Sequence, residues 1–192
     1  RLFDLGIASG MRLKLSEAIA LQDVQKGRVH VSTTYGFIGV IFLSLLFIFY
    51  IVNPYLNWQN ILNTSLISQS ELTRLASITV SFVILGFILQ TINYVYLAHG
   101  NSIAEGIIQL IISSITLLLS WLASAFADKG NLILLGTILT GLPVFAYSVV
   151  TAYTFYYKFP HFRPSIKLIN FRKSRSLIFL SFQNFVSSIT YS

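Results

Sequence analysis

The sequence predicts an all-α, polytopic transmembrane helix bundle. Residues 31–70, 75–104, 106–127 and 130–157 contain no Asp, Glu, Lys or Arg. Each stretch holds an apolar run of about 20 residues, the length that an α-helix needs to cross a hydrocarbon core about 30 Å thick. Eleven of the thirteen Lys and Arg residues lie before and after these four runs, in the first 28 residues and in residues 158–175. An even number of crossings puts both basic segments on one side, which the positive-inside rule makes the cytoplasmic side.

Composition and motifs exclude several classes of function. The chain is 55% hydrophobic and 10% charged, whereas a soluble domain averages about 25% charged residues. The net charge is +7, and most of the Lys and Arg residues that carry it flank the apolar runs. We therefore expect these residues to set membrane topology and not to bind nucleic acid. The chain has no cysteine, its three histidines are solitary, and no enzyme motif is present. We therefore expect no catalytic residue, no metal and no cofactor.

The first 31 residues are interpreted as the end of a preceding span followed by a cytoplasmic amphipathic helix. Gly6 and Gly10 are expected to loosen the exit turn of that span. Over residues 11–28, apolar residues such as Met11 and Leu15 recur at helical spacing. This pattern predicts a helix that lies along the membrane surface.

Four complete spans are predicted within residues 32–157. They cover residues 32–52, 72–97, 103–125 and 132–156. A short turn at residues 98–101 predicts that the second and third spans form an antiparallel hairpin. Ser102 and Glu105 form a capping-box pattern at the start of the third span. Pro143 removes a helix hydrogen bond in the fourth span, which predicts a kink.

The remaining residues extend this plan. Residues 158–175 are predicted to be a basic cytoplasmic loop. Residues 176–192 are uncharged and are interpreted as the truncated start of a further span. The chain begins with Arg and has no signal peptide, so we expect it to be part of a longer protein.

Polar residues recur along two of the predicted spans. Those of the third span follow a winding stripe: Glu105, Gln109, Ser113, Thr116, Ser120 and Ser124. The second span adds Gln90, Asn93 and Tyr94 on one face. Such side chains avoid hydrocarbon and are expected to face other helices or a water-filled cavity.

Two interpretations of these polar residues remain open. Ser and Thr can bond back to their own helix and allow close packing. Helical rise places Gln90, Asn93 and Gln109 at a similar depth, about 10 Å from the turn. They predict either a polar pocket for sugar hydroxyls or hydrogen bonds between helices. Glu105 either caps its helix, where the dipole favours a carboxylate, or couples transport to a proton or cation.

The opening segment FDLGIASGMRLKLSEAIA closely resembles a known family motif. In bacterial O-antigen and capsule repeat-unit flippases, the segment after the second span commonly has this pattern. These flippases form the polysaccharide-biosynthesis branch of the multidrug/oligosaccharidyl-lipid/polysaccharide exporter superfamily. The matching positions are Asp4, Leu5, Gly6, Ile7, Gly10, Arg12, Lys14, Leu15, Glu17 and Ala18. The later segments STTY, NPYLNW, GLPVF and RPSIKLINF also resemble that family, in order and spacing, whereas Ser9, Leu13 and His99-Gly100 depart from it.

The resemblance implies that the chain is a fragment of the N-terminal lobe of a two-lobe transporter with about 12–14 spans. Such a protein moves an undecaprenyl-diphosphate-linked oligosaccharide repeat unit across the bacterial inner (cytoplasmic) membrane by alternating access. It is a transporter and not an enzyme. Its implied partners are the lipid-linked oligosaccharide, membrane lipids and other polysaccharide-assembly proteins.

The resemblance also suggests roles for individual residues. Arg12 and Lys14 are expected either to contact the substrate diphosphate or to serve topology and anionic lipid contact. Asp4 is expected to pair with Arg12 as a hinge lock. The candidate substrate-binding residues are Arg12, Lys14, Gln90, Asn93, Tyr94, Gln109, Ser113 and Thr116. The candidate hinge or coupling residues are Asp4, Gly6, Gly10, Glu105 and Pro143.

Two functions are alternatives to a flippase. A cation-coupled multidrug-type exporter of the same fold would be expected to carry an ionisable residue deep in this lobe, where the chain has only Ser, Thr, Gln and Asn. A membrane-embedded polysaccharide polymerase or ligase would need a catalytic residue facing a large outer loop. The longest outer loop predicted here is short and nearly uncharged.

Overall fold

The computed structural model describes residues 7–126 and 132–170, and within these ranges the chain is helical, with no strand. The α-helices are α1 (Ile7–Ala20), α2 (Val24–Val52), α3 (Trp58–Ile61), α4 (Gln69–Gln90), α5 (Ile92–Ala98), α6 (Ser102–Phe126) and α7 (Leu132–Tyr153). Short 3₁₀ turns form η2 (Asn53–Tyr55), η4 (Pro160–Phe162) and η5 (Ile166–Leu168), and a π-helical turn forms η3 (Thr154–Lys158).

Four helical segments in the described part of the chain are long and apolar enough to cross a membrane. They are Val24–Tyr55, Gln69–Ala98, Ser102–Ala125 and Leu132–Lys158. This confirms the predicted all-helical class for the described residues, and the four long apolar helices agree with the prediction of a multi-pass membrane protein. The predicted start of a further span, the outer turn around residue 129 and the last part of the basic loop lie outside the described residues.

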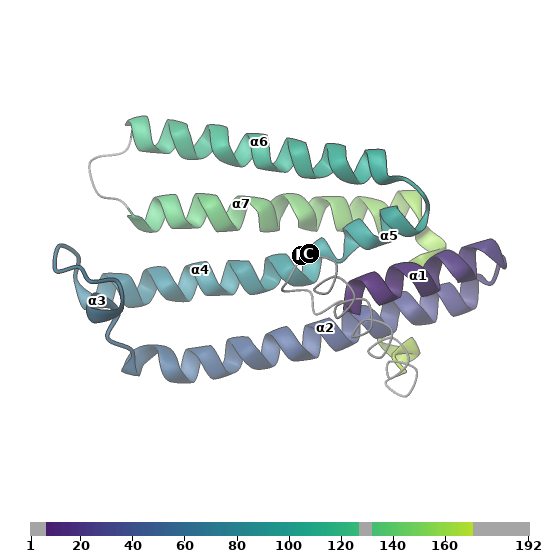
Figure 1. Ribbon diagram of the computed structural model, residues 1–192, viewed down its shortest axis with the longest axis horizontal. Helices are drawn as coiled ribbons and strands as arrows, with labels where there is room; N and C mark the ends of the chain where they lie inside the picture. The colour runs from purple at the N-terminus through teal and green to yellow at the C-terminus, as the bar shows by residue number, and fades with distance from the viewer. Residues whose placement is uncertain (1–6, 127–131, 171–192) are drawn as a thin grey trace, which may run out of the picture.

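The four spans form a row in the order α6, α7, α4 and α2 (Figure 1). The prediction that the second and third spans pack as a hairpin is therefore wrong. The short turn does connect α5 to α6, but α7 lies between α6 and α4, and α4 packs mainly on α7. Connection length constrains the ends of two helices but not their neighbours along the rest of the span.

Small residues allow the close contact between α4 and α7. A Cβ atom at Gly136 would lie 2.6 Å from Leu75 Cδ1, and one at Gly141 would lie 3.1 Å from Phe82 Cε2. Glycines permit such approaches between membrane helices. Helix α7 continues through Pro143, and the kink expected there stays a prediction.

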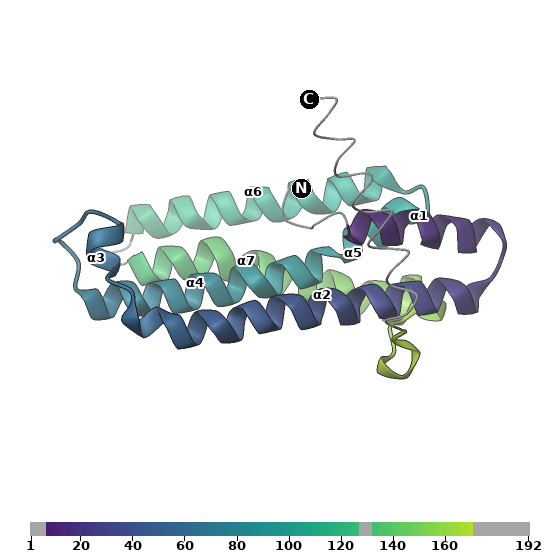
Figure 2. The same ribbon diagram turned by 60° about the horizontal axis from the view of Figure 1, so that its bottom comes forward.

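The boundary between the first two helices differs from the one that the sequence pattern predicted. The predicted helix over residues 11–28 is divided, because α1 ends at Ala20 and α2 begins at Val24. Gln22 takes a left-handed backbone conformation with φ of 55°, and the Asp23 side chain accepts a hydrogen bond from the Lys26 backbone as the N-cap of α2. Helix α1 turns back alongside α2 (Figure 2).

The predicted second span agrees with a span over Gln69–Ala98, within which Thr91 separates α4 from α5. At this point the Thr91 N–H donates to the Ile88 carbonyl at 3.4 Å and the Tyr94 N–H donates to the Thr91 carbonyl at 3.2 Å, so the hydrogen bonds join residues three apart. β-Branched and amide side chains of low helix propensity meet at this point. The third span is capped not by Ser102 but by Asn101, whose Oδ1 accepts from the Ala104 backbone at 3.2 Å.

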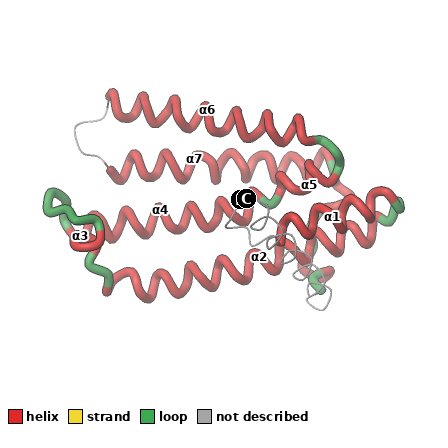
Figure 3. The backbone as a smooth tube through the Cα atoms, in the orientation of Figure 1, coloured by secondary structure: helices red, strands yellow, loops and turns green. Residues whose placement is uncertain are grey.

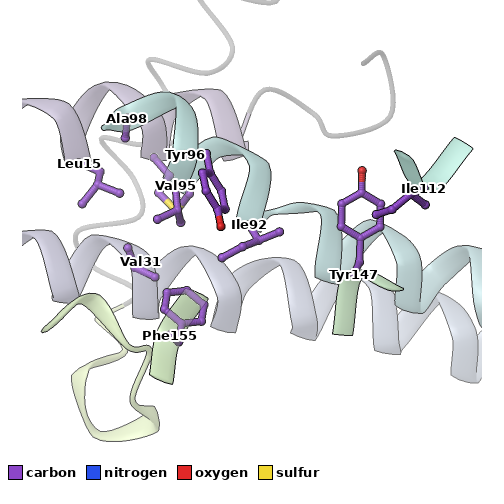
Figure 4. Packing of buried hydrophobic residues seen from close by; sticks show 10 residues of the cluster. Leu15, Val31, Ile92, Val95, Tyr96, Ala98, Ile112, Tyr147 and Phe155 are labelled. Atoms are coloured by element: carbon purple, nitrogen blue, oxygen red, sulfur yellow. The ribbon is translucent and has the colours of Figure 1, made fainter. Parts of the chain in front are cut away.

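Helix α1, helix α5 and the start of α2 meet at one end of the bundle (Figure 3). The main hydrophobic core lies there (Figure 4). Met11 and Leu15 of α1 are fully buried against Val31, Ile92 and Val95. The apolar stripe predicted for α1 is therefore confirmed as a packing face. It fixes α1 to the spans and so determines where the charged residues on its other face lie.

Candidate functional site

Figure 1 shows that α1, the start of α2, the α5–α6 turn and the end of α7 lie at one end of the bundle. These elements and the segment after α7 carry most of the described basic residues. We call this end of the bundle the basic end; its described Lys and Arg residues are Arg12, Lys14, Lys26, Arg28, Lys158, Arg163 and Lys167. In the described part of the chain, Arg74 is the one basic residue near the opposite end. The alternation of four spans therefore places the basic segments together, as predicted.

Arg12 and Lys14 project from α1 into different surroundings. The Lys14 ammonium donates to Glu17 Oε2 at 2.8 Å and lowers the pKa of the Glu17 carboxyl. Arg12 is exposed and has no ion pair among the described residues. Arg12 is thus the more available cation for an anionic ligand. Its predicted partner Asp4 lies outside the described residues.

The glycines proposed to loosen the turn before α1 do not both do so. Gly10 is buried inside α1 and has helical backbone. The prediction that it belongs to a turn is wrong, since α1 already begins at Ile7. Gly6 lies outside the described residues.

The predicted amide pocket does not assemble from its three members. Asn93 Nδ2 donates to the hydroxyl of Tyr147 in α7 at 3.2 Å. Gln90 and Gln109 are both exposed, and α7 lies between the helices that carry them. Tyr94 is half-buried and packs against the main core. The sequence analysis left open either a polar pocket or hydrogen bonds between helices, and Asn93 forms a hydrogen bond between helices.

The polar stripe of α6 also separates into two kinds of residue. Thr116 is buried, and its hydroxyl donates to the Ile112 carbonyl at 2.7 Å. Gln109 and Ser113 are exposed, and Glu105 is half-buried in the first turn of α6. Thr116 therefore satisfies its hydroxyl within its own helix, as the structural interpretation requires.

A second polar row, which the sequence analysis missed, lines the inner side of α7. Tyr147, Thr151 and Thr154 occur at helical spacing. The Thr154 hydroxyl is 2.9 Å from that of Tyr96, and Asn93 donates a hydrogen bond to the hydroxyl of Tyr147. We call these five residues the polar seam. Two buried atoms of the seam, Asn93 Oδ1 and Thr151 Oγ1, have no hydrogen-bond partner among the described residues. The seam therefore offers uncharged hydrogen-bonding groups. The i, i+4, i+7 spacing of Tyr147, Thr151 and Thr154 in the sequence could have predicted this polar row.

Aromatic rings surround the turn at the basic end. The His99 ring stacks on Phe159, with centroids 3.8 Å apart, and meets the edge of Phe162 at 5.3 Å. His99 Nδ1 donates to the Val95 carbonyl at 2.8 Å. Burial lowers the pKa of His99, an effect that the nearby Lys158 charge reinforces and the Val95 hydrogen bond opposes. His99 is thus a packed, neutral ring at neutral pH.

At the opposite end of the bundle, a hydrogen-bond network surrounds the side chain of Asn53. Its Nδ2 donates to Ser77 Oγ at 2.7 Å and to the Thr73 carbonyl at 3.3 Å, while its Oδ1 accepts from Trp58 Nε1 at 2.8 Å. The indole N–H of Trp58 thereby links the loop after α2 to the bundle. Asn53 is buried, and the sequence analysis did not single it out.

No protein-family model, curated protein or solved structure matches this chain. Among the described residues, no group of three or more His, Cys, Asp or Glu residues is placed to hold a metal ion.

Proposed function

We propose that this chain is part of the N-terminal lobe of a flippase. Its cargo would be an undecaprenyl-diphosphate-linked oligosaccharide repeat unit, moved across the bacterial inner membrane by alternating access. The basic end would then face the cytoplasm. The proposal rests on the combination of a basic end with an interior whose described residues bear hydroxyls and amides but no charge pair.

The physical chemistry of the cargo calls for both features. A charged diphosphate and hydrated sugars cannot cross hydrocarbon unaided, because each would lose its hydration. Exposed cations at the cytoplasmic mouth would attract the diphosphate, and neutral hydrogen-bonding groups would replace water around the sugars. Arg12 is the first candidate for the diphosphate contact, because Lys14 is already paired with Glu17.

The same interior argues against the multidrug alternative. A cationic drug would be favoured by a carboxylate deep between the spans. In the described residues, Glu105 and Glu71 both lie in the first turns of their helices. The middle of each span carries neutral polar groups, which suit carbohydrate better than a cation.

The test is rescue of surface polysaccharide in a bacterial strain that lacks its own repeat-unit flippase and produces the cognate repeat unit. The full-length gene would be expressed as wild type, as Arg12→Gln and as Arg74→Gln. Arg74 is the matched control, because it is also an exposed arginine in a helix but lies at the opposite end. Membrane abundance of each variant would be measured in parallel.

We expect rescue by the wild type and by Arg74→Gln, and at least about tenfold less polysaccharide with Arg12→Gln, equivalent to about 1.4 kcal/mol. Equal rescue by all three would remove Arg12 from the substrate path while keeping the flippase assignment. Failure of the wild type at normal membrane abundance would contradict the assignment itself.

A further inference from the structure

The segment after α7 returns across α2 as a strap. We use this name for residues 159–170, which contain η4 and η5. Figures 1 and 2 show the strap in yellow-green, projecting past α2 on the side opposite α6. It follows the fourth span directly and so leads the chain from α7 to whatever lies beyond residue 170.

Hydrogen bonds join the strap backbone to the α2 side chains. The Ser165 N–H donates to Ser32 Oγ at 2.9 Å, and the Asn170 N–H donates to Thr33 Oγ1 at 3.1 Å. Ser32 and Thr33 are each only 1% exposed. Two adjacent hydroxyls thus satisfy backbone donors that a loop without regular structure would otherwise leave to water.

Two glycines of α2 make room for the strap. A Cβ atom at Gly27 would lie 2.5 Å from Phe162 Cε1, and one at Gly36 would lie 2.7 Å from Ile169 Cδ1. Phe162 and Ile169 therefore lie directly on the α2 backbone. Gly39, one turn further along, has nothing within 4 Å of such a Cβ atom. The close approach is confined to the part of α2 that the strap covers.

A third contact holds the middle of the strap. Arg28 Nε donates to the Arg163 carbonyl at 2.9 Å, while Arg163 itself lies over the Tyr156 ring, 4.4 Å from its centroid, and donates to the Tyr156 hydroxyl at 3.0 Å. The strap is thus bound to α2 and to the end of the fourth span together. Opening it would expose buried hydroxyls, backbone donors and two apolar side chains at the same time.

We propose that the strap is a permanent mechanical link, which stays bound to α2 and transmits motion between α2 and the chain beyond residue 170. The inference rests on the proposed transport function for its role, but the permanent attachment can be tested without it. A strap that detached during each cycle would act instead as a releasable latch.

A disulfide tests the attachment directly, because the chain has no cysteine. Both Cγ atoms of Ile169 lie 3.2 Å from the position of a Cβ atom at residue 36. The Cβ atoms of a Gly36→Cys/Ile169→Cys pair would therefore be close to the spacing of about 3.8 Å found in disulfides. The Ile169→Cys change also removes the Cδ1 atom that a Cβ atom would strike. Gly39→Cys/Ile169→Cys is the control pair.

The full-length protein in native membranes would be oxidised with a mild catalyst. We expect at least about tenfold more disulfide in the Gly36 pair than in the control, since only close Cβ atoms can be bridged. Equal yields would contradict the observed packing. If the Gly36 pair does not reach the membrane, Ser32→Cys/Ser165→Cys provides a second bridge at the hydrogen bond between those residues.

The transport activity of the oxidised protein then tests whether the strap stays bound to α2 throughout the transport cycle. A permanent link predicts that polysaccharide export stays within about twofold of the reduced protein, a change below 0.5 kcal/mol. Inhibition that a reductant reverses would overturn the proposal and make the strap a latch. If the wild-type protein does not transport, the proposed function fails, whereas a high disulfide yield that is the same in resting and polysaccharide-producing cells still supports the permanent link.

Discussion

Asn93 in the second span donates a hydrogen bond to the Tyr147 hydroxyl in the fourth span at 3.2 Å. This contact follows from the order of the spans, since α4 packs mainly on α7 and α5 also contacts α7. An amide placed between two apolar helices must find a partner, because hydrocarbon offers none. The Asn93–Tyr147 pair therefore links the two spans and forms one end of the polar seam.

The energy of this link can be measured with a double-mutant cycle. Tyr147→Phe, Asn93→Ala and the double variant would be unfolded in detergent by titration with sodium dodecyl sulfate. We expect a coupling energy of about 0.6 kcal/mol, with an upper value of about 1.7 kcal/mol, as for other hydrogen bonds between membrane helices. Additive effects of the two substitutions would show that the residues do not interact.

Close packing of α4 on α7 predicts a difference between two glycines. Gly136→Leu is expected to destabilise the bundle by about 1–3 kcal/mol, because its side chain would strike Leu75. Gly106→Leu in α6 is the matched control, since a Cβ atom there has nothing within 4 Å. Denaturant titration of both variants checks this. Equal stability of the two variants would contradict the packing of these spans.

The network at the opposite end predicts a role for Asn53. Asn53→Ala leaves the Trp58 indole N–H and the Ser77 hydroxyl without this partner, which we expect to lower the free energy of unfolding by about 1–3 kcal/mol. Asn60→Ala is the control, because Asn60 is exposed in α3, within the same connection between α2 and α4. Thermal unfolding in detergent distinguishes them, and a smaller loss for Asn53→Ala than for Asn60→Ala would refute the assignment.

His99 predicts a pH dependence of stability. Its pKa in the folded protein is below the ordinary value of about 6.5, so the unfolded chain binds a proton more readily. The contribution of His99 is fully present above pH 6.5. It is lost as the pH falls from there toward the lowered pKa of the folded state. Melting temperatures at pH 7.5 and pH 5 would show this loss in the wild type.

The control for this prediction is His99→Phe. Phenylalanine can keep the stacking on Phe159 but cannot take up a proton. Its melting temperature should fall less between the two pH values than that of the wild type. An equal fall in both proteins would assign the pH dependence to other groups.

Hydropathy and charge were sufficient to predict the four spans and the gathering of basic residues. The length of an apolar run determines whether a helix can cross a membrane, and the positions of Lys and Arg determine its orientation. Both can be read directly from short stretches of the sequence. The burial of Met11 and Leu15 was predictable for the same reason, since helical periodicity marks one face of α1.

The neighbours of each span were not predictable from the same patterns. Glycines such as Gly136 and Gly36 set close contacts, but a sequence does not show which partner approaches them. This is why Gln109 was paired with Asn93, although α7 lies between α6 and α4. The break at Thr91 likewise depends on i+3 hydrogen bonds that compete with helical ones by small energies.

The central claim is that the full-length protein moves a lipid-linked oligosaccharide across a bilayer. We would reconstitute it into vesicles with the undecaprenyl-diphosphate-linked repeat unit from the organism that encodes it, and follow with a membrane-impermeant sugar-specific probe how fast the cargo moves between leaflets. The account predicts movement at least about tenfold faster than in protein-free vesicles, because the protein lowers the barrier to moving charge through hydrocarbon. Movement at the protein-free rate, with the protein folded and inserted, would contradict it.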